Sequence, residues 1–114
     1  MMLPLGLFAV AAIGGLIMAV RIFAGGTPPW VLSLLHAAFG AAGIVTLYLA
    51  VAGSAVGGLA WIALGLFVVA ALGGFFLASF HLRGQAHPKA VVALHALLAV
   101  SGFGILAGLA FGLV

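Results

Sequence analysis

Two histidines, His36 and His95, lie inside long apolar stretches of the chain, and each follows a proline by seven residues. A neutral imidazole is the commonest metal ligand among side chains, and it titrates near physiological pH. An ionisable residue inside an apolar helix is a functional candidate, and it faces the interior of the helix bundle. Equal spacing from a helix-starting proline places both imidazoles roughly 10 Å along their helices. We therefore take His36 and His95 as the candidate ligands of a metal or cofactor.

The amino-acid composition excludes most other chemistry. Of the 114 residues, 68% are hydrophobic and only three are Lys or Arg, and the chain contains no Asp, Glu or Cys. A soluble domain usually has about 25% charged residues, so a soluble globule is excluded. Without Cys there is no disulfide framework, thiol catalysis or cysteine zinc site. Without acids there is no carboxylate acid–base pair and no calcium or magnesium cage. The net positive charge does not indicate nucleic-acid binding, because no basic cluster sits on a soluble fold.

Four apolar stretches are each long enough to cross a bilayer as a helix, which takes about 20 residues. They cover residues 3–23, 29–52, 59–82 and 89–112. The short breaks between them combine Gly with Pro, Ser or polar residues, which end helices and make turns. We expect one transmembrane domain over residues 1–114, an all-α integral membrane four-helix bundle. We do not interpret the first stretch as a signal peptide, because residues 1–7 carry no Lys or Arg.

The three cations predict the orientation in the membrane. Arg21, Arg83 and Lys89 all lie beside the first and third breaks, which share one side of a four-span chain. The positive-inside rule places that side in the cytoplasm. We expect both termini to be periplasmic and loops 24–28 and 83–88 to be cytoplasmic, in a bacterial inner membrane.

The two halves of the chain resemble each other. When the chain is shifted by 59 residues, nine of eleven positions are identical between residues 5–15 and 64–74. Over residues 1–55 against 60–114, 18 of 55 positions are identical, including His36 with His95. We interpret this pattern as a duplicated helical hairpin. Each unit has two spans, so both copies insert in the same orientation around a pseudo-two-fold axis along the membrane normal.

Such a repeat brings His36 and His95 to the same depth on the second and fourth helices. Small residues follow each histidine on the same helical face: Gly40 and Gly43 in the first half, Ala99 and Gly102 in the second. Small residues permit close helix packing in lipid. A flat macrocycle ligated from both faces also needs small residues beside it, so we expect these four to line a cofactor groove.

Haem b fits this set of groups. A closed zinc site normally has four protein ligands, whereas a porphyrin supplies four nitrogens and needs only axial ligands from the protein. Haem propionates need cationic or hydrogen-bonding partners. Arg21, Arg83 and Lys89 lie at the membrane edge nearest the histidines, so we expect them to serve as those partners.

With these two ligands, the chain resembles the b-type membrane cytochromes, in which transmembrane helices hold haem through paired histidines. Cytochrome b561 proteins and the haem-bearing anchors of succinate dehydrogenase are examples. The resemblance covers the architecture and the positions His36 and His95. It implies an electron-transfer subunit, not an enzyme, that works with a quinone or within a larger redox complex. It does not extend to the second haem of the b561 proteins, because His81 and His87 are not in mid-span.

Two other functions remain open at this point. A cofactor-free accessory subunit of a larger membrane complex would use the histidines for helix packing, bonded to each other, to Ser33, Ser101 or to backbone. A (bacterio)chlorophyll-binding subunit of a photosynthetic complex would use one imidazole per pigment. Self-association into a homo-oligomer is also open. We expect His81 and His87 at the membrane interface, and the paired glycines 14–15 and 73–74 at points of helix packing.

Overall fold

The computed structural model describes residues 1–114 as four helices connected by short loops, with no strand. The helices are α1 (Met2–Phe23), α2 (Trp30–Ala52), α3 (Gly58–Leu82) and α4 (Lys89–Ala110). Each is long and apolar enough to cross a membrane. The 23 residues of α2, for example, correspond to about 34 Å of helix against a hydrocarbon core of about 30 Å. The expected all-α four-helix architecture is therefore confirmed, and it fits an integral membrane protein.

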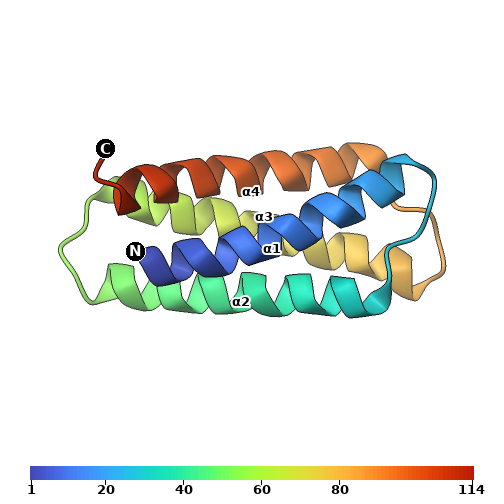
Figure 1. Cartoon of the computed structure of the whole chain (residues 1–114), viewed down its shortest axis with the longest axis horizontal. Helices are drawn as coiled ribbons and strands as arrows, with labels where there is room; N and C mark the ends of the chain where they lie inside the picture. The colour runs from blue at the N-terminus through green and yellow to red at the C-terminus, as the bar shows by residue number, and fades with distance from the viewer.

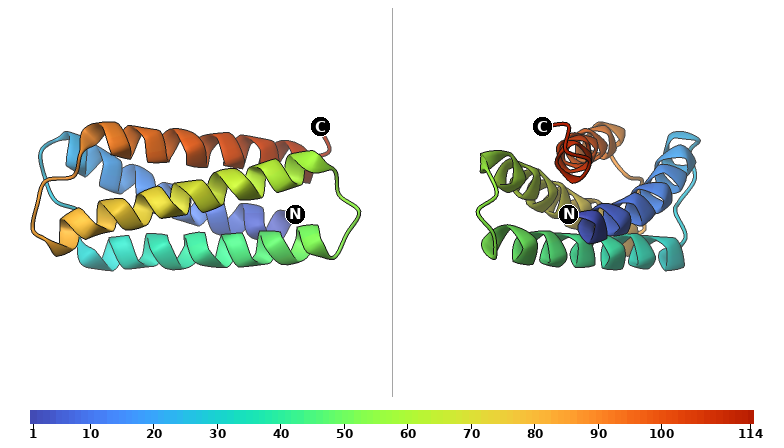
Figure 2. Two further views of the ribbon diagram at one scale, coloured as in Figure 1. Left: turned by 180° about the vertical axis from the view of Figure 1, so that it is seen from behind. Right: turned by 60° about the vertical axis from the view of Figure 1, so that its left-hand side comes forward.

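The helices form an up-and-down bundle in which α2 and α4 lie on opposite sides (Figure 1). α1 and α3 cross between them, one in front and one behind in that view. Each helix packs against its neighbours in the chain, and α1 packs against α4 to close the ring. Both termini and the loop over residues 53–57 lie at one end (Figure 2). We call the other end, formed by loops 24–29 and 83–88, the basic end, because it carries the three cations.

The two turns at the basic end are built alike. Gly25 and Gly84 have φ values of +88° and +63°, a conformation that glycine adopts without a steric penalty. In each turn the next residue donates its N–H to a carbonyl of the last helical turn: Gly26 to Arg21, and Gln85 to Phe80. This pattern is the Schellman motif that ends helices. Pro29 and Pro88 then stand at the N-caps of α2 and α4, where a missing N–H costs little.

Little of the chain is buried, and no buried residue is polar or charged. The main core cluster lies in the half of the bundle away from the basic end and consists of Leu5, Phe8, Leu47, Val51, Ala60, Leu64, Phe67 and Leu106. A smaller cluster of Ile22, Leu77 and Val92 lies towards the basic end. The outward faces carry many exposed large hydrophobic side chains. Such an exterior suits lipid, which solvates apolar side chains and excludes polar ones.

Candidate functional site

His36 and His95 meet in the interior of the bundle, from the opposite helices α2 and α4. Their ring centroids are 6.0 Å apart, and the ring planes are inclined by 70°. Both side chains are partly buried. We refer to them as the inner pair. The structure thus brings together the two residues that the sequence singled out.

Each imidazole of the inner pair is fixed by a hydrogen bond to a backbone carbonyl of its own hairpin. Nδ1 of His36 lies 2.7 Å from the carbonyl oxygen of Ala11, and Nδ1 of His95 lies 2.7 Å from that of Ala70. A carbonyl oxygen only accepts, so in both residues Nδ1 carries the proton and donates it. In a neutral ring with Nδ1 protonated, Nε2 keeps its lone pair. Histidines that bind metals show this arrangement, in which the second ring nitrogen donates to a carbonyl or carboxylate.

Glycines on α1 and α3 make room for the two rings. A Cβ atom on Gly15 would lie 2.9 Å from Cε1 of His36, and one on Gly74 would lie 3.2 Å from Cε1 of His95. Sequence reasoning assigned these glycines to helix packing alone and did not identify Ala11 or Ala70. The signal was present, because all four belong to the most similar segments of the two halves, residues 5–15 and 64–74.

The small residues that we expected to line a cofactor groove contact other side chains or open space instead. A Cβ atom on Gly43 would come within 2.7 Å of the Phe8 ring, and one on Gly102 within 3.3 Å of the Phe67 ring. Gly40 has open space around its Cβ position, and Ala99 is partly buried. Gly43 and Gly102 therefore make room for phenylalanines of α1 and α3, about two helical turns beyond the histidines.

These phenylalanines pack against each other across the bundle. The rings of Phe8 and Phe67 are stacked with centroids 3.6 Å apart and planes within 5° of parallel. Leu47 and Leu106 belong to the same cluster and are fully buried. We call these four residues the apolar plug. It closes the bundle between the inner pair and the end that carries the termini.

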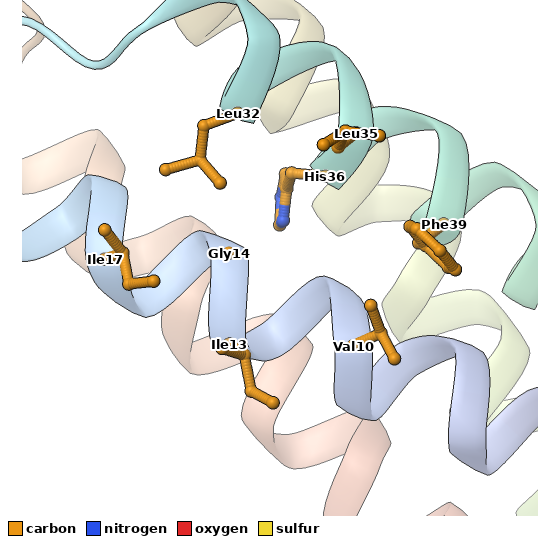
Figure 3. A pocket seen from close by; sticks show the side chains of 8 residues that line it. All are labelled: Val10, Ile13, Gly14, Ile17, Leu32, Leu35, His36 and Phe39. Carbon is orange, nitrogen blue, oxygen red and sulfur yellow. The ribbon is translucent and has the colours of Figure 1, made fainter.

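His36 also borders an apolar groove between α1 and α2, with a volume of about 200 Å³. Figure 3 shows its side chain reaching from α2 towards α1, with Leu32 and Phe39 before and after it on α2 and Gly14 on α1 opposite. Six of the eight lining residues are hydrophobic. The groove therefore gives apolar molecules, but not ions, an approach to His36 from outside the bundle.

The three cations lie at the basic end, yet none of them contacts the inner pair. The Arg83 guanidinium donates to the carbonyl and hydroxyl oxygens of Ser79, and it lies 4.6 Å from the Phe80 ring centroid. Lys89 Nζ lies 5.9 Å from the ring centroid of Phe23. Arg21 is exposed in the last turn of α1. The cations share the expected end, and the side chains of Arg83 and Lys89 contact other partners.

The remaining two histidines, which we call the loop pair, also lie at the basic end. His81 is in the last turn of α3 and stacks on Trp30, with centroids 3.7 Å apart and planes within 8° of parallel. His87 is in the following loop, and its ring centroid is 5.7 Å from that of His81. Burial, followed by the proximity of His81, holds the pKa of His87 below its usual value.

Comparison of the chain with protein-family models, with curated proteins and with solved structures finds no match. Fold and site together describe a helical protein suited to a membrane, with two imidazoles close together in its interior. No cluster of three or more His, Cys, Asp or Glu residues is present. A metal held here would take at most these two side chains of that kind as ligands.

The inner pair has the spacing that two axial ligands of one metal require. A metal–imidazole bond is about 2 Å long, and the ring centre lies about 1 Å behind the nitrogen, so opposed rings would have centroids about 6 Å apart. The observed separation is 6.0 Å. The apolar plug lies towards the termini, about two helical turns beyond the histidines along α2 and α4. The donor set and the ring separation of the inner pair are compatible with a metal that a prosthetic group carries.

Proposed function

We propose that the chain is an electron-transfer subunit of a membrane, which holds haem b between α2 and α4 with His36 and His95 as axial ligands. The single observation that carries the proposal is the matched Nδ1 hydrogen bond of each histidine to a carbonyl oxygen at 2.7 Å. In a neutral imidazole, this hydrogen bond leaves Nε2 as the nitrogen that can bind a metal. The two rings are 6.0 Å apart.

The donor set favours a porphyrin over a bare metal ion. The chain has no thiolate or carboxylate to add to the two imidazoles, and a closed zinc site normally needs four such ligands. When bound, haem iron would carry one electron by changing between the ferrous and ferric states. With both axial positions taken by histidine, the protein would leave no site for a substrate on the iron.

The chain's own residues would orient and insulate the group. Ala11 and Ala70 hold the imidazoles by their carbonyl oxygens, and Gly15 and Gly74 keep α1 and α3 close to the rings. The apolar plug excludes water on one side. Exclusion of water is one of the means by which a protein sets the reduction potential of a haem. Lys89 and Arg21 at the basic end are the candidate partners for propionates, since Arg83 already bonds Ser79.

We also infer that the protein arose by duplication of a helical hairpin and lies in a bacterial inner membrane with its basic end in the cytoplasm. The repeated sequence supports the first inference, and the one-sided cations support the second. Little of the chain extends beyond the four helices. It would therefore work beside a larger redox complex or with a quinone.

Absorption spectroscopy of the purified protein tests the haem proposal. We expect sharp α and β bands on reduction with dithionite, from one haem per chain, when the host is supplied with haem. The double variant His36→Ala, His95→Ala, purified in the same way, should lack them. A colourless wild-type protein would refute haem and favour a cofactor-free accessory subunit, whereas absorption in the far red would identify a chlorophyll-type pigment instead.

A further inference from the structure

The basic end contains a polar hollow whose lining shares only Lys89 with the residues of the proposed haem site. It lies between loops 24–29 and 83–88 and has a volume of about 390 Å³. Only two of its ten lining residues are hydrophobic. Its polar side chains are those of Thr27, His81, Gln85, His87 and Lys89. In a chain with so few polar residues, this is a marked concentration of hydrogen-bond donors.

We propose that this hollow binds a phosphate group, presented either by an anionic lipid headgroup or as free phosphate. The five polar side chains around it can all donate hydrogen bonds, and Lys89 supplies a positive charge. The inference does not involve His36 or His95. It shares Lys89 with the proposed propionate partners, and Arg21, which does not line the hollow, remains available for that role.

The charge distribution favours an anion in this place. The chain contains no Asp or Glu, so no acidic side chain of its own can neutralise Lys89 or a protonated histidine. The titratable groups lining the hollow are His81 from α3, His87 from the loop and Lys89 from α4. Arg83, close in sequence, is held outside by Ser79 and Phe80. An anion would stabilise the protonated forms of both histidines, because opposite charge favours the charged state.

The start of α4 adds to this preference. Lys89 is the first residue of α4, which has no side-chain cap and no acidic residue in its first turn. The unpaired N–H groups at a helix start carry a partial positive charge. Loop side chains, Lys89 and the start of α4 thus all contribute donors or positive charge at the same end of the molecule.

The opposite end of the bundle offers nothing comparable. The loop over residues 53–57 has Ser54 as its only polar side chain, and that hydroxyl donates to the carbonyl oxygen of Ala50. No Lys, Arg or His side chain lies there. Since polybasic segments at the membrane surface attract anionic lipids, the phosphate plane on the side of the basic end is where a headgroup could enter the hollow.

Trp30 provides a direct probe, because it stacks on His81 at the edge of this region. The only other tryptophan, Trp61, lies in the first turn of α3 at the far end, so Trp61→Phe leaves one reporter. Its fluorescence should be followed at about pH 6, where histidine is partly protonated. One arm adds sodium phosphate in neutral detergent at constant ionic strength. The other compares phosphatidylcholine vesicles with and without phosphatidic acid.

We expect a saturable change in at least one arm. A response to phosphate in detergent would support a site open to the free anion, and a response only to phosphatidic acid would support a headgroup site. Lys89→Gln and His87→Gln should each weaken binding about tenfold, because a neutral amide replaces a donor that can carry a positive charge. Lys89→Arg should keep most of the affinity.

Arg83→Gln is the matched control, because it removes the same charge from a side chain outside the hollow. It should change the affinity less than about twofold, in line with a screened surface charge. Helix content by circular dichroism identifies any variant that fails to fold. The proposal would be overturned by the absence of a saturable response in both arms, or by equal losses in folded Arg83→Gln and Lys89→Gln.

Discussion

The inner pair and the loop pair have nearly the same ring separation, 6.0 Å and 5.7 Å, but very different surroundings. Each ring of the inner pair comes from a different hairpin, donates from Nδ1 to a carbonyl and lies against a glycine. In the loop pair, by contrast, His81 lies in the last turn of α3 and His87 in the loop that follows it. His81 is held by stacking on Trp30, and neither ring of the loop pair has a side-chain hydrogen bond.

This difference shows that distance alone does not define a ligand pair. A metal ligand must present a lone pair in a fixed direction, which requires the other nitrogen to be occupied by a donor bond. The inner pair meets that condition within the apolar part of the bundle. The loop pair lies outside the apolar part of the bundle, and no hydrogen bond occupies its ring nitrogens, which suits recognition of an anion at the surface.

Single alanine variants of the four histidines should give the largest contrast. His36→Ala and His95→Ala should each abolish the low-spin haem spectrum, because one axial ligand is lost. His81→Ala and His87→Ala should keep it. The measurement is the reduced-minus-oxidised spectrum at equal protein concentration. Full retention of the spectrum in His36→Ala would refute the ligand assignment, and its loss in His87→Ala would transfer the role to the loop pair.

The glycine contacts allow a finer test of the inner pair. Gly15→Ala places a Cβ atom 2.9 Å from Cε1 of His36, so the ring or α1 must move. We expect a loss of about 1–3 kcal/mol in stability, the usual range for overpacking, and weaker haem retention. Gly14→Ala is the control, because its nearest contacts would be ordinary ones of 3.6 Å and 3.8 Å.

Thermal unfolding in detergent and haem titration would measure both glycine variants. Gly74→Ala should have a smaller effect than Gly15→Ala, since its closest contact is 3.2 Å. If Gly14→Ala and Gly15→Ala had the same stability and the same haem retention, a close contact with α1 would not be what positions the His36 ring.

The smallest expected effect is that of pH on stability through the protonation of His87. The pKa of His87 is lowered by burial and, to a lesser degree, by His81. His87 is therefore neutral at pH 7 and takes up its proton only below the usual value of about 6.5. The unfolded chain binds this proton more readily, so the associated stability is present at neutral pH and is lost as pH falls below about 6.5.

Nitrogen NMR of labelled histidine would follow this titration. His81→Gln removes the charge effect and should move the pKa of His87 part of the way back, leaving the effect of burial. An unchanged His87 titration in that variant would show that the two rings do not interact. Added phosphate should raise the pKa of His87, which links this measurement to the proposed anion site.

The sequence was sufficient to predict the four helices and the meeting of His36 with His95. Apolar length defines a span, and the shift of 59 residues places both histidines at equivalent positions. The partners of these residues were not predictable. Helical periodicity identifies the face that carries Gly43 and Gly102, but which neighbour fills the space depends on how α1 and α3 cross. For the same reason the carbonyls of Ala11 and Ala70 were missed.

The apolar plug also decides from which side the interior can be reached. Phe8, Phe67, Leu47 and Leu106 fill the bundle on the side of the termini, and the groove beside His36 is almost entirely apolar. The polar hollow of the basic end lies on the other side of the inner pair. Under the proposed function, the plug would therefore confine the exchange of protons with the inner pair to the basic end.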